Sequence, residues 1–214
     1  MPDWAKVLPA QEWHAALLQY IEIVVTRYQN HPALVSWQLE NEALLQSFGD
    51  SSGDFDRARL RREFALVKTL DKVHPVIMTL SDSYGIPVHA PKPDAFAMSI
   101  YRITMNQKGQ LKYSKRPALF YRLRALVIFV LRWRGVFIHE LQAEPWESKA
   151  ITQVPRAQQL AQMGTQRLTK NVHFAKSTGM NPVDLWGLEW WYWLKVTKNE
   201  PKDWQVMKKL LHDS

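Results

Sequence analysis

The sequence predicts an α/β fold, a parallel sheet of the (β/α) barrel type, and two observations favour it. Short apolar runs alternate with stretches of helical periodicity from one end of the chain to the other. Polar residues follow several of those runs, at the strand ends where a (β/α) barrel gathers its functional side chains. The chain has 214 residues, and a complete barrel usually needs about 250. We therefore expect an incomplete (β/α)8 barrel that forms one domain over residues 1–214.

Strands and helices are expected to alternate along the chain. Apolar residues three or four positions apart define each predicted helix, and short continuous apolar runs define each predicted strand. The predicted strands are Ala33–Leu39, Val76–Leu80, Ala95–Tyr101, Val136–Glu140 and Val183–Trp190. The predicted helices are Ala10–Gln29, Asp54–Val73, Pro117–Trp133, Pro155–Ser177, which Gly179 would cap, and Asp203–His212. Loops are expected at Gly49–Gly53 and in the proline-rich segment 84–94.

Composition excludes several classes of site. Lys and Arg number 28 against 20 Asp and Glu, but they are mostly dispersed along predicted helices without a nucleic-acid motif. We therefore expect a solvated basic surface and no nucleic acid as partner. The absence of cysteine excludes disulfides, thiolate metal sites and cysteine nucleophiles. No membrane span is expected, because the longest apolar run, Ala125–Leu131, is far shorter than the roughly 20 residues required. The first residues also lack the pattern of a signal peptide.

Two glutamates, Glu42 and Glu140, end different predicted strands at equivalent points, so both should project into the same mouth of a barrel. Hydrolysis of a glycosidic bond needs two carboxyl groups flanking that bond, about 5.5 Å apart when the configuration at the sugar is retained. We therefore expect these two carboxyl groups to lie about 5–6 Å apart. No metal is expected, because neither His31 nor His139 has a second ligand at suitable spacing, and no organic cofactor is implied.

The stretch from His31 to Glu42, His-Pro-Ala-Leu-Val-Ser-Trp-Gln-Leu-Glu-Asn-Glu, resembles the fourth-strand motif of the clan A glycoside hydrolases. That superfamily includes the family 5 cellulases and mannanases. The resemblance implies that Glu42 is the general acid/base and that Asn41 binds the sugar hydroxyl next to the reacting carbon. The stretch Gly135–Glu140 is similar to the seventh-strand motif of the clan, which implies that Glu140 is the nucleophile.

The same resemblance assigns roles to aromatic side chains. Tyr101 matches the tyrosine that hydrogen-bonds the nucleophile, and Trp190 or Trp191 matches the aromatic platform under the sugar at the cleavage point. This tryptophan-rich run could instead be core packing against the last helix. Glu144 is a rival nucleophile, although Glu140 lies at the usual depth along its strand.

The resemblance covers strands four to eight of a TIM barrel and implies a retaining glycosidase, acting on β-linked oligosaccharides or polysaccharides. Strands one to three have no counterpart in the sequence, nor does the arginine that strand two supplies to support the nucleophile. We therefore expect the isolated chain to be poorly soluble and inactive, and an N-terminal barrel half to be its partner.

Two alternatives remain open. The chain could be a non-catalytic carbohydrate-binding or structural remnant of such a barrel, which keeps the motifs without turnover. It could also be a basic nucleic-acid-binding protein, whose binding would weaken steeply with salt. The sequence indicates neither the sugar, the linkage nor the cellular location.

Overall fold

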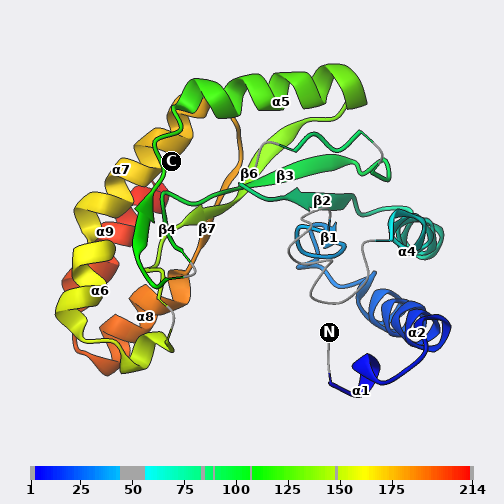
Figure 1. The fold of residues 1–214 in the computed structure, drawn as a ribbon, viewed down its shortest axis with the longest axis horizontal. Coiled ribbons are helices and arrows are strands. Elements are labelled where there is room, and N and C mark those ends of the chain that lie inside the picture. The colour runs from blue at the N-terminus through cyan, green and yellow to red at the C-terminus, as the bar shows by residue number, and fades with distance from the viewer. Residues whose placement is uncertain are drawn as a thin grey trace. The chain divides into compact units, whose positions relative to one another are not determined.

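The computed structural model describes residues 3–43, 56–82, 85–88, 90–106, 108–147 and 149–212. Helices and strands alternate along the chain, as the sequence predicts (Figure 1). The main sheet has the strand order β1-β2-β3-β6-β7, which is sequence order apart from the hairpin β4–β5 inserted after β3. The pairings of β1 with β2 and of β6 with β7 are parallel. The fold is therefore α/β, with a parallel five-stranded sheet of the barrel type.

The elements have the following bounds. The sheet strands are β1 Trp37–Gln38, β2 Val76–Leu80, β3 Ala95–Ile100, β6 Val136–Gln142 and β7 Val183–Trp186. The antiparallel hairpin is β4 Ile103–Met105 and β5 Leu111–Tyr113. The helices are α1 Asp3–Lys6, α2 Ala10–Tyr28, α4 Arg57–Leu70, α5 Ala118–Arg132, α6 Arg156–Gln162, α7 Thr165–Thr178, α8 Leu188–Thr197 and α9 Pro201–His212, with a short 3-10 turn at Ile151–Gln153.

The chain divides into two compact units. The first unit is Met1–Ala97 with Leu126–Val136, and the second is Met98–Ala125 with Phe137–Ser214. In the first unit every residue of β2 is buried, and α2 packs on α4. The α4 helix begins after Asp56, whose carboxylate accepts a hydrogen bond from the backbone N–H of Ala58 at 2.7 Å.

In the second unit the core gathers large side chains from the sheet and from several helices. Tyr121, Ile138, Leu168 and Trp191 are fully buried, and α9 packs against α7 and α8. The α7 helix ends at Gly179, which has a φ of +75° and caps the helix in the left-handed conformation. The predicted glycine cap is therefore confirmed.

Two of the predicted strands are shorter than expected. The first consists only of Trp37–Gln38, because Val35 is 79% exposed and the preceding residues are not extended against β2. The last ends at Trp186, and Gly187, with a φ of +100°, turns the chain into α8. The prediction that Trp190 and Trp191 end a strand is therefore wrong, because both lie in this helix.

The predicted helix Pro155–Ser177 is also wrong as a single element. It is broken between α6 and α7, where Met163 and Gly164 are extended. The hairpin β4–β5 was not predicted. Its turn is closed by the Asn106 side chain, which accepts hydrogen bonds from the backbone of Lys108 and Gln110. The predicted loop Gly49–Gly53 lies outside the described residues, and the described part of segment 84–94 contains no helix.

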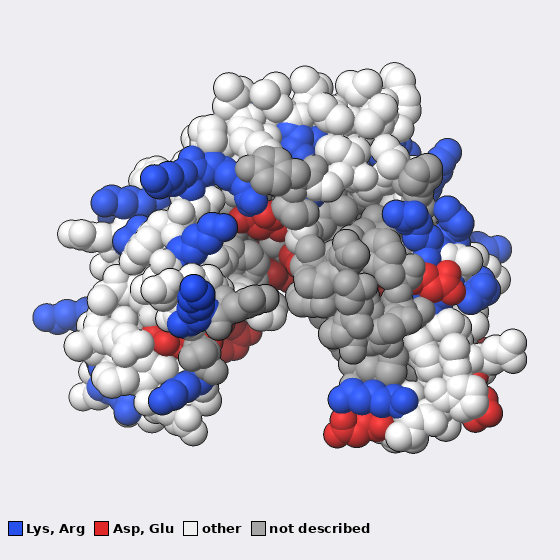
Figure 2. All heavy atoms as spheres, in the orientation of Figure 1, with Lys and Arg blue, Asp and Glu red and all other residues white. Residues whose placement is uncertain are grey.

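Charged side chains on the face that Figure 2 shows are spread out. Lys and Arg lie scattered among uncharged residues there and form no single continuous patch. This distribution agrees with the dispersed basic surface expected from the sequence. Within the part of the chain that the structure describes, no helix is long and apolar enough to cross a membrane.

Candidate active site

The carboxylate of Glu140 lies in the second unit, near the C-terminal end of β6, and is almost fully buried. The hydroxyl of Tyr101, the residue after β3, donates a hydrogen bond to Glu140 Oε2 at 2.6 Å. The hydroxyl of Ser99 lies 3.4 Å from the same oxygen. The hydrogen bond that the resemblance implies for Tyr101 is therefore present. Two hydroxyl groups from the neighbouring strand fix the orientation of this carboxylate.

An aromatic side chain that sequence reasoning missed lies beside this pair. The rings of Trp146 and Tyr101 meet edge to face, with centroids 5.1 Å apart and planes at 84°. Trp146 is 38% exposed, so part of its ring faces solvent. It follows Glu140 closely in the sequence, and that proximity was the signal that could have identified it.

The side chain of Gln142, at the end of β6, forms hydrogen bonds with the backbone that follows Tyr101. Its amide nitrogen donates to the carbonyl oxygen of Ile103 at 2.8 Å, and its amide oxygen accepts from the N–H of Ile103 at 2.9 Å. The same oxygen accepts from the N–H of Arg102 at 3.1 Å. These bonds tie the end of β6 to the segment that follows Tyr101, so Tyr101 is held in position relative to Glu140.

The rival glutamate, Glu144, lies beyond the end of β6 in a different setting. Burial raises the pKa of its carboxyl above the usual value; the charge of Glu189 acts in the same direction, and a hydrogen bond with the Trp186 side chain opposes it. The side chain packs on Gly187, where an added Cβ would lie 2.4 Å from Glu144. The hydroxyl groups of Tyr101 and Ser99 bind the carboxylate of Glu140 instead, and the choice of nucleophile between the two glutamates stays a prediction.

The pair Asn41–Glu42 lies in the first unit, shortly after β1. Glu40 and Glu42 have φ values of 57° and 48°, the left-handed conformation that residues other than glycine rarely adopt. The N–H of Glu42 donates to Thr79 Oγ1 at 2.7 Å, and the Thr79 hydroxyl lies 3.3 Å from the Glu40 carbonyl oxygen. Thr79, in β2, thereby clasps both ends of this turn. We call residues 40–42 the acid/base turn, after the role that the sequence predicts for Glu42.

A buried ionic cluster adjoins the acid/base turn. Arg59, on α4, donates from Nη1 to Glu40 Oε1 at 2.8 Å and also contacts the carboxylate of Glu63 one helical turn further along. Glu63 is fully buried. Burial raises the pKa of Glu63 to about 7, although the positive charge of Arg59 opposes the shift. Nothing in the local sequence pattern identified this cluster.

The two candidate catalytic carboxylates belong to different units. Glu42 lies in the first and Glu140 in the second, so the separation of their carboxyl groups stays a prediction. Asn41 is exposed, and its side-chain oxygen accepts a hydrogen bond from Gln38 at 3.3 Å. Its contact with a sugar hydroxyl likewise stays a prediction.

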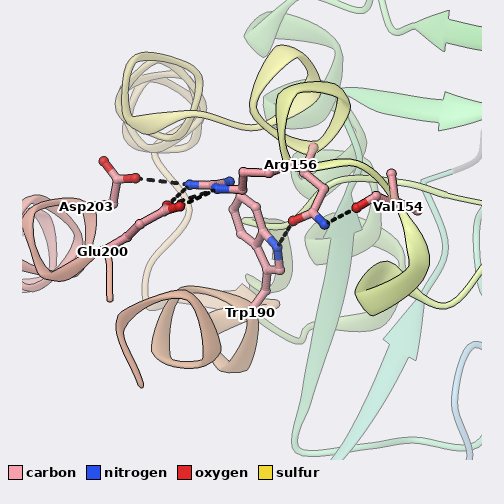
Figure 3. A network of polar contacts seen from close by, with 6 residues as sticks. Val154, Arg156, Trp190, Glu200 and Asp203 are labelled. Atoms are coloured by element: carbon pink, nitrogen blue, oxygen red, sulfur yellow. Dashed lines mark hydrogen bonds and ion pairs between the residues drawn. The ribbon is translucent and has the colours of Figure 1, made fainter. Parts of the chain in front are cut away.

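Trp190 and Trp191 are both buried, 3% and 0% exposed. The indole N–H of Trp190 donates to Gln159 at 2.9 Å, and that of Trp191 donates to the Ala143 carbonyl oxygen at 2.6 Å. Figure 3 shows Trp190 beside Arg156, with its indole nitrogen joined by a hydrogen bond to a network of polar contacts. This burial favours core packing for both residues, and their contact with a sugar stays a prediction.

The network around Trp190 also joins α6 to Glu200, the residue before α9, and to Asp203, in the first turn of α9. The Arg156 guanidinium lies over the Trp190 ring, 5.4 Å from its centroid. It forms ion pairs with Glu200 and Asp203, the latter at 3.2 Å (Figure 3). The Trp190 ring is therefore covered on a face by a paired cation, and its N–H is already satisfied by protein.

Comparison with known proteins agrees with this fold. The family model of glycosyl hydrolases family 2, TIM barrel domain, matches residues 2–117. The human (Homo sapiens) β-glucuronidase is 32% identical over 95 residues, which span 44% of this chain and 14% of the human protein. The chain thus matches only a small part of the length of that relative.

Two solved xylanase structures share the fold. Xylanase XynB from Paenibacillus barcinonensis has a TM-score of 0.55 at 13% identity, and the match covers 88% of this chain and 62% of that one. Xylanase 10C from Cellvibrio japonicus also has a TM-score of 0.55, at 18% identity, over 88% of this chain and 42% of that one. At these identities the likeness shows the barrel-type fold alone.

The glycoside hydrolase resemblance expected from the sequence holds at the level of the barrel, but the family 5 likeness is not supported. The matched family is family 2, and its model covers more than half of the chain, including the first three strands of the sheet and Asn41–Glu42. The chain belongs to glycosyl hydrolases family 2, TIM barrel domain.

Proposed function

We propose that the chain contributes the acid/base and the nucleophile of a retaining glycosidase acting on β-linked glycosides. The observation that supports it best is the buried Glu140 carboxylate, which receives the Tyr101 hydroxyl at a strand end of a family 2 barrel domain. A carboxylate held in this way is oriented for attack.

The reaction would proceed in two steps. Glu42 protonates the leaving oxygen while Glu140 attacks the anomeric carbon, which forms a covalent glycosyl-enzyme and releases the first product. Glu42 then removes a proton from the incoming water, and the hydroxyl so formed displaces Glu140. Asn41 would bind the sugar hydroxyl next to the reacting carbon. Metal and organic cofactors have no role in these steps.

We propose Trp146 as the aromatic side chain that contacts the sugar. It lies next to Tyr101 and is partly exposed, whereas Trp190 and Trp191 are buried and donate their N–H groups within the protein. An exposed indole face stacks well on the apolar face of a sugar ring. Trp190 or Trp191 could contact substrate only after leaving these surroundings.

β-Glucuronides are the substrates to test first, because the curated relative described above is a β-glucuronidase. The sheet described here has five strands, and a (β/α) barrel has eight. We therefore also propose that turnover depends on a barrel half carrying three further strands, supplied by a longer chain or by a separate polypeptide.

The test is to trap the covalent intermediate. The chain would be incubated with a 2-deoxy-2-fluoro β-glycoside carrying a good leaving group, alone and with a polypeptide corresponding to strands one to three of a family 2 barrel. Peptide mass spectrometry should locate the sugar on Glu140. Labelling of Glu144 instead would replace Glu140 as the nucleophile.

The non-catalytic alternative makes a different prediction. A carbohydrate-binding remnant would bind β-glycosides in a calorimetric titration without labelling or turnover in either arrangement. That combination of results would overturn the proposed hydrolase function.

A further inference from the structure

The acid/base turn has a backbone conformation that must be held by its surroundings. Glu40 and Glu42 are both left-handed, although neither is glycine. Residues with side chains persist in this region only where surrounding contacts over-determine them, and such positions cluster at functional sites. The contacts that hold the turn therefore decide where the carboxyl group of Glu42 points.

Two groups of described contacts hold the turn, one to its backbone and one to the side chain of Glu40. Thr79, in β2, clasps the backbone through the Glu42 N–H and the Glu40 carbonyl oxygen. Arg59, in α4, binds the side chain of Glu40 through Nη1 at 2.8 Å. The Thr79 clasp belongs to the sheet, whereas the Arg59 contact depends on a helix distant from the turn in sequence.

Arg59 is itself fixed by buried partners. The same Nη1 contacts the Glu63 carboxylate, and the guanidinium lies 5.4 Å from the centroid of the Trp13 ring, on α2. Arg59 is 7% exposed and Glu63 is fully buried, and Glu63 Oε2 has no hydrogen-bond partner in the structure. An ion pair buried in this way is a weak source of stability, because desolvation offsets the attraction. A role in fixing the position of Glu40 is a better account of this ion pair.

We infer that Arg59 is a positioning residue, which anchors Glu40 and so fixes the turn that presents Asn41 and Glu42. This inference rests on the proposed role of Glu42 as the acid/base. Glu63 contacts the same Nη1 of the guanidinium as Glu40 does, and Glu40 is the link between the buried pair and the backbone of the turn. No contact of Arg59 with substrate is required.

The consequence is local. Without the Arg59–Glu40 contact, the left-handed turn keeps the Thr79 clasp but loses the anchor of one of its two strained residues. The turn should then open more often, which breaks the hydrogen bond of the Glu42 N–H. Amide hydrogen exchange measures such local opening directly.

The experiment compares exchange rates by NMR in the 214-residue chain and three variants. Arg59→Gln removes the positive charge, and Arg59→Lys keeps it. Arg62→Gln, on the same helix, is the matched control, because Arg62 is largely exposed and its ion pair with Asp56 is long, at 3.8 Å. We expect the Glu42 amide to exchange about tenfold faster in Arg59→Gln, with partial recovery in Arg59→Lys. The control should match the native chain.

A fourth variant protects the test if Arg59→Gln fails to fold. Glu40→Gln removes the negative charge that Arg59 binds, from a partly exposed side chain, and leaves the buried pair of Arg59 and Glu63 in place. It should raise the hydrogen-exchange rate of the Glu42 amide and leave the exchange rates of amides within α4, such as that of Val67, unchanged. Unaltered Glu42 exchange in Glu40→Gln overturns the inference. Uniform acceleration across α4 also overturns it, since the cluster would then only stabilise the helix.

The exchange measurement is independent of turnover. If the chain complemented with the further barrel half hydrolyses no glycoside but Glu42 exchange responds as expected, the proposed function fails while the anchoring of the turn stands. Where turnover is measurable in the complemented protein, Glu40→Gln should lower kcat with little change in KM and should shift the limb of the pH profile that depends on the acid/base. A purely structural role would not move that limb.

Discussion

The surroundings of Glu42 and Glu140 differ in the backbone that presents each residue. Glu140 is in β6, where the pairing with β7 has an irregularity, and its carboxylate is bound by the hydroxyl groups of Ser99, in β3, and Tyr101, the residue after β3. Glu42 follows a two-residue strand, and its backbone N–H donates to Thr79 Oγ1. Hydrogen bonds from β3 and the residue after it therefore orient Glu140, whereas the backbone of Glu42 depends on a strained turn and on the contacts that hold it. The turn should be the easier of the two to disturb.

The largest expected effect distinguishes Glu140, in β6, from Glu144, which follows that strand. Glu140→Gln should lower turnover by at least about a thousandfold, because an amide cannot form the glycosyl-enzyme. Glu144→Gln is the matched control and should lower it by less than about tenfold. The measurement is kcat/KM on a β-glycoside in the complemented protein. The reverse order would assign the nucleophile to Glu144.

The next effect concerns the backbone near Glu144. Gly187→Ala should lower the free energy of unfolding by about 3 kcal/mol, because it combines a φ of +100° with a Cβ only 2.4 Å from Glu144 atoms. Gly135→Ala is the control, since an added Cβ there meets nothing within 4 Å. Urea unfolding measures both. Equal losses would show that the approach of Glu144 to Gly187 is unimportant.

The stability of the first unit should depend on pH through Glu63. Its pKa in the folded state is raised to about 7, above the ordinary 4.5. The folded state therefore binds the proton more tightly than the unfolded state. The resulting stabilisation is fully present below pH 4.5 and is lost as the pH rises through about 7.

The size of this loss is on the order of 2–3 kcal/mol. The groups that face Glu63 are Arg59, which opposes the raised pKa, and Glu40, which supports it. Glu63→Gln should flatten the pH dependence of thermal unfolding between pH 4.5 and 7. Glu22→Gln, an exposed position on α2, removes the same charge and should leave the dependence intact. A flat profile in the native chain would contradict the raised pKa.

The smallest effect tests the hydroxyl groups at Glu140. Tyr101→Phe removes the 2.6 Å hydrogen bond and should lower kcat about tenfold, while Ser99→Ala, which removes the 3.4 Å contact, should lower it about threefold. Steady-state kinetics in the complemented protein measures both. A larger effect for Ser99→Ala would show that the shorter hydrogen bond is not the one that orients the carboxylate.

The sequence by itself determined the order of the elements. The strand Val76–Leu80 has the predicted bounds, and α2 differs from its prediction by one residue at its end, because apolar runs and helical periodicity are local patterns. The Asn41–Glu42 motif and its likeness to glycosidase barrels could also be identified from the sequence, since the residues of that motif are contiguous. Family 2 membership came only from comparison with known proteins.

Tertiary structure decided what local patterns could not. Trp190 and Trp191 belong to a helix because Gly187 reverses the backbone after β7, and their burial depends on the packing of α8. The hydroxyl of Ser99 and the guanidinium of Arg59 reach Glu140 and Glu40 from other elements, 41 and 19 positions away in the chain. Such contacts form only after the elements have packed, so the motifs predict which residues react while the packing determines what holds them.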